Sequence, residues 1–351
     1  MTTPTPRTPG TQTPTPRTEG STAVRFRFRG WGGVTAMAAL VGVLTLAVAL
    51  LLPLAREHRD SGLDSTPAAR TAPAAESCVS PEAQTLAPSA ADGPTIAAIK
   101  ARTGEQRKLV VGVDQNSYRW GYRNPNNQGA ALEGFDIDLV HAIAQNILGD
   151  RNAVQFKAIP TDRRIGAVRS GEVDMVVRTT TITCARLKEV AFSAPYFRTG
   201  QQVLAAKSLA LTGFDNSLRG RTVCAAAGST TEADLKEGKF GVKPLIVPNQ
   251  LDCLVRLQLG EADAVITDGA LAASQAAQDP TVELKGKPFT EDYYGVMMRK
   301  DADDLVRRVN QVLAQYRAGG WQTAYDRWLA PTMGGDSRPY LPANPRYLRT
   351  S

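Results

Sequence analysis

Histidine is almost missing from this chain, whose 351 residues contain only His58 and His141. Histidine is the commonest side chain for proton transfer near neutral pH and the commonest metal ligand. The sequence also lacks a G-x-S-x-G turn around a nucleophilic serine, a G-x4-G-K-[ST] phosphate loop and any cluster with metal-ligand spacing. These absences argue against catalysis, and no cofactor or metal is expected.

One stretch lacks charge altogether. Residues 34–55 (VTAMAALVGVLTLAVALLLPLA) are apolar and long enough to cross about 30 Å of hydrocarbon as a helix. The arginines that precede this stretch outweigh the single glutamate there, whereas the charges after it nearly cancel. The positive-inside tendency therefore predicts a single-pass anchor in the cell membrane, with a cytoplasmic tail over residues 1–33 and everything after residue 55, the binding domain included, outside the cell. The tail is rich in Thr, Pro and Arg and poor in apolar residues, so it is expected to be disordered. A cleaved signal peptide has the same order and stays open as an alternative.

The net charge of +7 does not indicate a nucleic-acid partner, because more than half of it lies before residue 34. Residues 56–95, rich in Ala, Pro, Ser and Thr, are predicted to form an extended spacer.

Cysteine is also scarce, and the four present are expected as disulfides because the outside compartment is oxidising. Four cysteines permit three pairings. We favour Cys224 with Cys253, since they end a strand-like run and open a helical one in the same half of the chain. That choice leaves Cys78 for Cys184. Free buried thiols are the alternative.

From about residue 96 onward, short β-branched apolar runs alternate with helical patterns, and the alternation occurs twice. This pattern predicts an α/β fold with two lobes, each built on a parallel sheet, joined by two crossing strands. The predicted boundaries are 96–200 for the first part of lobe 1, 201–291 for lobe 2, 292–332 for the return of lobe 1, and 333–351 for a C-terminal tail.

Polar side chains follow four of the predicted strands: Asp114, the turn 179–186, the GSTT segment 228–231, and Asp268. In open α/β sheets, ligands bind beyond the carboxyl ends of the strands. Arg186 could hold both oxygens of a carboxylate, and Asp268 with the threonine oxygens suits an ammonium. The set therefore predicts a site for the head group of an α-amino acid.

Each of these residues also has a purely structural interpretation. Ser229 and Asp268 precede helices, where a capping side chain contributes about 1 kcal/mol without any ligand. The threonines could be ordinary strand residues. Asp114 could close a turn and Arg186 could lie on a solvated face. Their coincidence at one sheet edge favours a ligand.

The segment GFDIDLVHAIAQNI (134–147) is followed in order by VDMVVRTTTITCARLKEVAFSAPYF, GRTVCAAAGST, EADAVITDGALAA and YGVMMRK. These pieces resemble the family 3 extracellular solute-binding proteins, which have the type II periplasmic-binding-protein fold. VCAAAGST, DCLVRL and VDQNSYRWGYRNP are most similar to the glutamate/glutamine-binding branch. The resemblance implies capture of a polar amino acid by closure of two lobes, with glutamate first, then aspartate, asparagine or glutamine.

The resemblance also implies roles for individual residues. Arg186 would bind the α-carboxylate of the ligand, and Asp268 would pair with its ammonium. Thr181 would contact both groups, and the Thr179 carbonyl would accept from the ammonium. Two hydroxyls of lobe 2 would add contacts to the carboxylate, those of Ser229 and Thr230.

The chain departs from the family pattern at Arg178, where a small residue is usual, and at Thr179, where glycine is frequent. Arg178 could meet an acidic ligand side chain, a role for which Arg164 and Arg119 compete, or it could pair with a structural carboxylate. Tyr122 belongs to an alternating aromatic trio that could lie against the ligand's stem or could serve packing alone.

Two kinds of partner fit the resemblance. One is the permease and ATPase complex of an ABC transporter, and the other is a membrane sensor partner that reads nutrient supply. A catalytically active member of the fold, such as a dehydratase or a cell-wall enzyme, is the alternative.

Overall fold

The computed structural model describes residues 78–127 and 129–350, all within the compact unit Ala74–Ser351. The predicted tail (1–33), the predicted anchor (34–55) and most of the predicted spacer (56–95) lie outside the described residues. Over the two described ranges, no helix combines the length and the apolar character that a membrane crossing requires.

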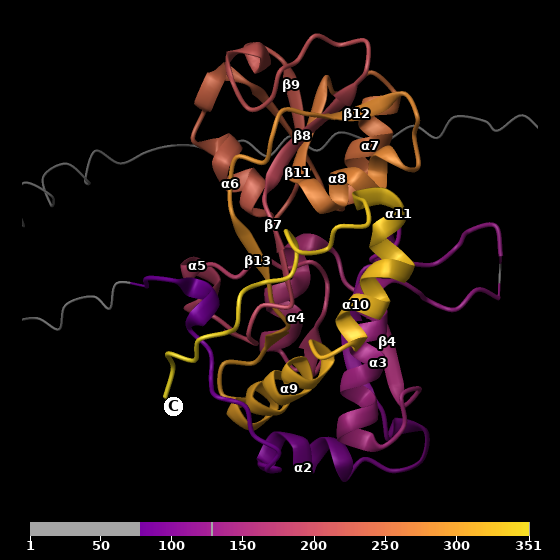
Figure 1. Cartoon of the computed structure of the whole chain (residues 1–351), viewed down its shortest axis with the longest axis vertical. Coiled ribbons are helices and arrows are strands. Elements are labelled where there is room, and N and C mark those ends of the chain that lie inside the picture. Colours follow the sequence, from indigo (N-terminus) through magenta and orange to yellow (C-terminus); the bar gives the residue numbers. More distant parts are fainter. Residues whose placement is uncertain (1–77, 128, 351) are drawn as a thin grey trace, which may run out of the picture. The chain divides into compact units, whose positions relative to one another are not determined.

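Two five-stranded sheets organise the described chain into two lobes (Figure 1). The sheet of lobe 1 has the order β4-β1-β5-β14-β6, with β1 (Leu109–Val113), β4 (Val154–Ala158), β5 (Met175–Val176), β6 (Ala191–Phe192) and β14 (Met297–Met298). The sheet of lobe 2 has the order β10-β9-β11-β8-β12, with β8 (Gln201–Ala206), β9 (Thr222–Ala226), β10 (Lys243–Val247), β11 (Ala264–Asp268) and β12 (Val282–Lys285). The two-lobe α/β fold is therefore confirmed.

The sheets are mixed rather than parallel, which corrects one detail of the prediction. In lobe 1, β1 pairs in parallel with β4 and β5, but β14 runs antiparallel to β5 and β6. In lobe 2, β9 pairs in parallel with β10 and β11, but β8 runs antiparallel to β11 and β12. The strands β8 and β14 are those by which the chain enters a lobe from the other lobe. No helical crossover precedes them, so nothing brings them back in the parallel direction.

The lobes are joined by two strands that pair with each other. β7 (Phe197–Thr199) leads from lobe 1 into β8, and β13 (Asp292–Tyr294) leads back toward β14. They pair antiparallel, with Thr199 opposite Asp292. In Figure 1, β7 and β13 lie between the labelled strands of lobe 2 above them and the helices α4 and α9 of lobe 1 below them.

Helices cover the sheets of both lobes. Lobe 1 carries α2 (Pro94–Lys100), α3 (Phe135–Leu148), α4 (Arg164–Arg169), α5 (Cys184–Leu187), α9 (Asp303–Tyr316), α10 (Gly320–Ala324) and α11 (Ala330–Met333). Lobe 2 carries α6 (Thr230–Lys236), α7 (Gln250–Gln258) and α8 (Gly269–Ala276). A short antiparallel pair, β2 (Asn116–Ser117) and β3 (Gly121–Tyr122), follows β1.

The hydrophobic pattern explains which faces are buried. In α3 the apolar residues recur at helical spacing and are buried: Ile137, Val140, Ile143, Ala144 and Ile147. In β9, Val223 and Ala225 face one core cluster of lobe 2, whereas Cys224 between them faces the other. This alternation shows that both faces of the lobe 2 sheet are covered.

The segments that flank the lobes pack against lobe 1. Leu86, within the range predicted as spacer, is fully buried and forms a parallel bridge with Arg349 near the C-terminus. The Asn310 amide donates to the Leu86 carbonyl at 2.6 Å. The described end of the predicted spacer and the predicted C-terminal tail therefore both contribute ordered contacts.

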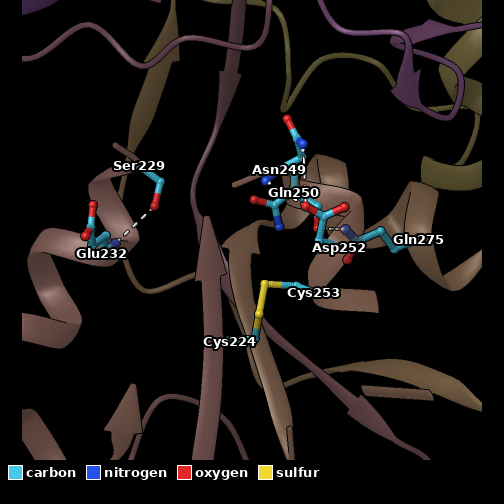
Figure 2. The surroundings of a disulfide bond; sticks show 8 residues. All are labelled: Cys224, Ser229, Glu232, Asn249, Gln250, Asp252, Cys253 and Gln275. Atoms are coloured by element: carbon cyan, nitrogen blue, oxygen red, sulfur yellow. Dashed lines mark hydrogen bonds between the residues drawn. A yellow bond between two sulfur atoms is a disulfide. The ribbon is translucent and has the colours of Figure 1, made fainter. Parts of the chain in front are cut away.

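The cysteines form the two disulfides that the sequence favoured. Cys78 is bonded to Cys184, which is the first residue of α5. Cys224 of β9 is bonded to Cys253 of α7, as Figure 2 shows. The second bond fixes α7 against the sheet, and Gln250, at the start of the same helix, accepts through its carbonyl from the Gln275 amide at 3.0 Å. The first disulfide thus fastens the beginning of α5 to the segment that precedes lobe 1, and the second fastens α7 to β9.

Candidate ligand-binding site

One small cavity collects polar side chains from both lobes. Its volume is about 30 Å³, room for about two water molecules. Eight of the nine predicted ligand-binding residues line it: Asp114, Arg178, Thr179, Thr181 and Arg186 from lobe 1, and Ser229, Thr230 and Asp268 from lobe 2. The sequence therefore found residues that the fold brings together at one place.

Arg186 enters the cavity from the short helix α5. The helix begins after Thr183, whose hydroxyl accepts from the Arg186 amide at 3.2 Å. The Arg186 guanidinium donates through Nη1 to the Thr181 carbonyl at 2.6 Å and through Nη2 to the Gly228 carbonyl of lobe 2 at 3.0 Å. Burial lowers the pKa of Arg186, while the carboxylates of Asp268 and Asp292 act in the opposite direction.

Arg164 makes a second connection to the same lobe 2 carbonyl. Its Nη2 donates to Gly228 at 3.3 Å, its Nε to the Thr161 carbonyl at 2.8 Å and its Nη1 to the Thr180 hydroxyl at 3.1 Å. Burial lowers the pKa of Arg164 strongly, and the neighbouring guanidinium of Arg186 adds to this effect. Two arginines of lobe 1 thus share one acceptor on lobe 2.

Arg178 is paired with a structural carboxylate, one of the two roles that its position allowed. Its Nη2 lies 2.7 Å from Asp114 Oδ2, and both side chains are less than a tenth exposed. Its Nη1 donates to the Thr161 hydroxyl at 2.9 Å. Asp114 also closes a turn, because it accepts from the amides of Gln115 and Asn116 at 2.8 and 2.9 Å. Asp114 and Arg178 therefore form a fixed ion pair in the wall of the cavity.

Asp268 ends β11 and precedes α8, but its side chain makes no capping hydrogen bond to that helix. Instead, its Oδ2 accepts from the Tyr294 hydroxyl at 2.7 Å. Burial, followed by the charge of Asp292, raises the pKa of Asp268 to about 7, against the lowering effect of the Tyr294 hydrogen bond. A buried carboxylate with a raised pKa is well suited to a cationic ligand group, which would stabilise its ionised form.

Ser229 and Thr230 lie where α6 begins. The Ser229 hydroxyl caps the helix by accepting from the Glu232 amide at 3.0 Å (Figure 2). Gly228, just before it, has a φ of +71° and lies against lobe 1. A Cβ atom at Gly228 would come within 2.7 Å of the Asp162 Cα. The two lobes are therefore in close backbone contact beside the cavity.

Thr179 and Thr181 form the turn after β5. Thr179 has a positive φ of 39°, and its amide donates to Asp136 Oδ2 at 3.1 Å. Thr181 forms an isolated antiparallel bridge with Tyr294.

The cavity lining does not include Tyr122. Tyr122 pairs with Asn116 in the β2–β3 ribbon, and its ring packs edge to face on Tyr118 with 5.2 Å between centroids. Tyr118 lies nearer the ligand site, in a small adjoining pocket that it shares with Gln250 and Leu271. Trp120, the third member of the aromatic trio, is fully buried in the core of lobe 1.

Sequence reasoning missed several lining residues: Ser117, Thr161, Gln250, Thr267 and Leu271. Thr231 was included only as part of the segment 228–231. Arg164 was considered only as an alternative to Arg178 for contact with an acidic side chain of the ligand. Two of the missed residues follow strands that the sequence did reveal. Thr161 comes soon after β4, and Gln250 opens the helix after β10. The same strand-end rule that found Asp114 and Asp268 would have found them.

The charges that line the cavity are complementary to those of a zwitterion. Its lining carries three guanidinium groups and two carboxylates, with many hydroxyls between them. Within the described part of the chain, no cluster of His, Cys, Asp and Glu could hold a metal ion. Two α/β lobes joined by a strand pair, with opposite charges meeting in the crevice between them, define the two-lobed class of solute-binding proteins.

Comparison with known proteins gives the family. Residues 109–331 match the bacterial extracellular solute-binding proteins, family 3, and the chain belongs to this family. The ABC transporter glutamine-binding protein of Bacillus subtilis is 34% identical over 236 residues, which cover 67% of this chain and 84% of that protein. The glutamate-binding protein of Corynebacterium glutamicum is 28% identical over 247 residues, covering 66% and 81%.

Solved structures agree with this assignment. The solute receptor for L-cysteine of Neisseria gonorrhoeae has a TM-score of 0.65 at 27% identity and covers 71% of this chain and 100% of that one. An ancestral arginine-binding protein bound to glutamine has a TM-score of 0.58 at 33% identity, covering 65% and 98%. These relatives are named as binding proteins, so they give the catalytic alternative no support.

Proposed function

We propose that the chain reversibly captures a polar amino acid between its lobes. The observation that carries this proposal is the placement of Arg186 and Asp268, which bring opposite charges into one cavity from separate lobes. Arg186 would bind the ligand α-carboxylate, and Asp268 its ammonium. Ser229 and Thr230 would add contacts to the carboxylate. Thr181 would lie between the two groups, with the Thr179 carbonyl facing the ammonium.

Binding requires motion of the lobes. The cavity volume of about 30 Å³ is smaller than a free amino acid, so the lobes would separate to admit the ligand and close over it. Each charge-assisted hydrogen bond in the closed cleft contributes roughly 1.5–3 kcal/mol. A few of them, net of the cost of closure, give about −8 kcal/mol, which corresponds to micromolar affinity.

Glutamate is the first candidate ligand, followed by aspartate, asparagine and glutamine. Three guanidinium groups face two carboxylates in the cavity wall, so an additional ligand carboxylate would balance the charge. Because Arg178 is already paired with Asp114, Arg164 is the better candidate for contact with that carboxylate. The relatives named for glutamine and glutamate support the same ligand class.

Delivery to an ABC permease and ATPase complex is the partner that the relatives support, since one of them is named as an ABC transporter component. A membrane sensor partner is the second proposal, and it rests on the predicted anchor and on the resemblance to the glutamate-binding branch. The extracellular position of the binding domain agrees with the family. A single-pass anchor at residues 34–55 remains part of this proposal.

Calorimetric titration of the full chain, purified in detergent, with the four amino acids tests the proposal. We expect micromolar binding of at least one of them. Arg186→Ala should abolish that binding because it removes the cation for the α-carboxylate. Arg169→Ala is the matched control, since Arg169 lies on the surface of the same lobe and pairs there with Glu189. Equal affinity of the two variants would refute the assignment of Arg186.

A further inference from the structure

Thr179 holds an unusual backbone conformation inside the ligand site. Its φ of 39° lies in the left-handed region, which β-branched residues rarely adopt. It is only 7% exposed and lines the cavity. Such conformations persist only where the surroundings impose them, and they gather at binding sites.

One contact to the Thr179 backbone comes from the beginning of α3. Asp136 is the second residue of that helix, and its Oδ2 accepts a hydrogen bond from the Thr179 amide at 3.1 Å. Its other oxygen accepts from the Tyr196 hydroxyl at 2.9 Å. Both carboxylate oxygens of Asp136 are thus used, one of them on the backbone of the ligand-binding turn.

Burying the carboxylate of Asp136 costs free energy. The side chain is 2% exposed, and its hydrogen-bond partners are an amide and a phenol rather than a cation. Burial raises its pKa to about 7, although the hydrogen bonds from Tyr196 and Thr179 act in the opposite direction. A buried carboxylate of this kind needs a structural reason, because an apolar residue would fill the position more cheaply.

We propose that Asp136 is a positioning residue for ligand binding, because its carboxylate holds the Thr179 backbone in the left-handed conformation that presents this turn to the amino acid. If the φ angle of Thr179 relaxed to a negative value, the peptide groups before and after Thr179 would rotate. They would no longer fit the turn between β5 and the Thr181–Tyr294 bridge. The Thr179 carbonyl would then move away from the ligand ammonium. The inference rests on the proposed function for the identity of the ligand.

A double-mutant cycle tests the proposal with the full chain and whichever of the four amino acids the wild type binds most tightly. Asp136→Ala should weaken binding about tenfold to a hundredfold, because the carboxylate that holds the strained Thr179 backbone is removed. In a Thr179→Gly background the same substitution should weaken binding less than about threefold, since glycine adopts positive φ without strain. Equal losses in the two backgrounds would overturn the inference.

The signature segment offers a matched control in Asp138, which lies in the same first turn of α3. Asp138 accepts from Trp328 Nε1 at 2.6 Å and does not line the cavity. Asp138→Ala should lower the melting temperature and leave the affinity within about twofold of wild type. An affinity loss as large as that of Asp136→Ala would show a general effect on α3 and would count against positioning.

Two measurements do not depend on the ligand, and the first of them does not need Asp136→Ala to fold. Thr179→Gly alone should melt a few degrees above wild type, because it relieves the strain and, among the described residues, no hydrogen bond to the Thr179 hydroxyl is lost. The Thr179 amide should exchange with solvent faster in Asp136→Ala than in Asp136→Asn, which keeps one acceptor oxygen. A lower melting point for Thr179→Gly, or equal exchange rates, would overturn the inference. Failure of the wild type to bind any of the four amino acids would instead refute the proposed function.

Discussion

At Gly228, closure of the lobes can be tested by adding a single methyl group. Its backbone has a φ of +71°, and an added Cβ would lie 2.7 Å from Asp162 Cα and 3.2 Å from Asp162 N. Both of these atoms belong to the backbone of lobe 1, so no side-chain rotation can relieve the contact. Gly228→Ala therefore opposes the closed arrangement of the lobes.

The expected loss of affinity follows from what the clash would break. Ordinary contact begins near 3.4 Å, so the lobes must separate locally by several tenths of an ångström. The Gly228 carbonyl accepts from Arg186 at 3.0 Å and from Arg164 at 3.3 Å, and such a shift takes both distances beyond hydrogen-bond range. Losing two charge-assisted bonds costs about 3 kcal/mol or more, which is about a hundredfold in affinity.

Gly238→Ala provides the matched comparison. Gly238 lies in the same lobe with a φ of +72°, and a Cβ there would meet nothing within 4 Å. Both variants carry the same left-handed strain of about 1 kcal/mol, which lowers the melting temperature by about 2–4 °C. Only Gly228→Ala should lose affinity in a calorimetric titration, and only it should shift the ligand-bound protein toward an open form in small-angle scattering. Equal affinities for the two variants would refute the inference that Gly228 sets the closed contact.

Two further predictions concern the charged groups of the cavity. Because the pKa of Asp268 is raised to about 7, an ammonium that favours its ionised form should bind fully above about pH 8 and about tenfold more weakly at pH 6. The stability of the ligand-free protein should change with pH in the opposite direction, since the stability contributed by a raised carboxyl pKa is lost as pH rises through 7. Titrations with ligand at pH 6, 7 and 8 should show the trend in affinity, and Asp268→Asn should abolish that trend. Asp114→Asn should lower the free energy of unfolding by about 3 kcal/mol, because it leaves the buried Arg178 without its carboxylate. If urea unfolding showed that Asp114→Asn lowers the free energy of unfolding by less than about 1 kcal/mol, this ion pair would contribute little to stability.

The fold could be predicted from the sequence where local patterns set the structure. The buried face of α3 was visible as helical spacing of Ile and Val, and the lobe strands were visible as short apolar runs. The mixed direction of the sheets was not visible. Strand direction depends on how the chain enters each lobe, and β8 and β14 are buried strands like their neighbours β11 and β5.

The candidate site shows a similar division. Asp268 and Arg186 were identified because strand ends carry binding residues in open α/β sheets. The partner of Arg178 was not identified, because Asp114 is 64 positions away and several carboxylates compete for one guanidinium. The role of Asp136 was also hidden. A carboxylate in the first turn of a helix is ordinary in sequence, and only the contact with Thr179 makes it unusual.

By itself, the sequence determined which chemical groups this protein carries at the ends of its strands. It also determined that the chain forms two α/β lobes, since periodicity and strand-end residues are local properties of the chain. Only the tertiary structure decided which two arginines reach lobe 2, which arginine is paired with a carboxylate in the cavity wall, and how closely Gly228 approaches Asp162. These outcomes depend on distances between segments far apart in the chain. Packing of the whole unit sets those distances, and no local pattern encodes them.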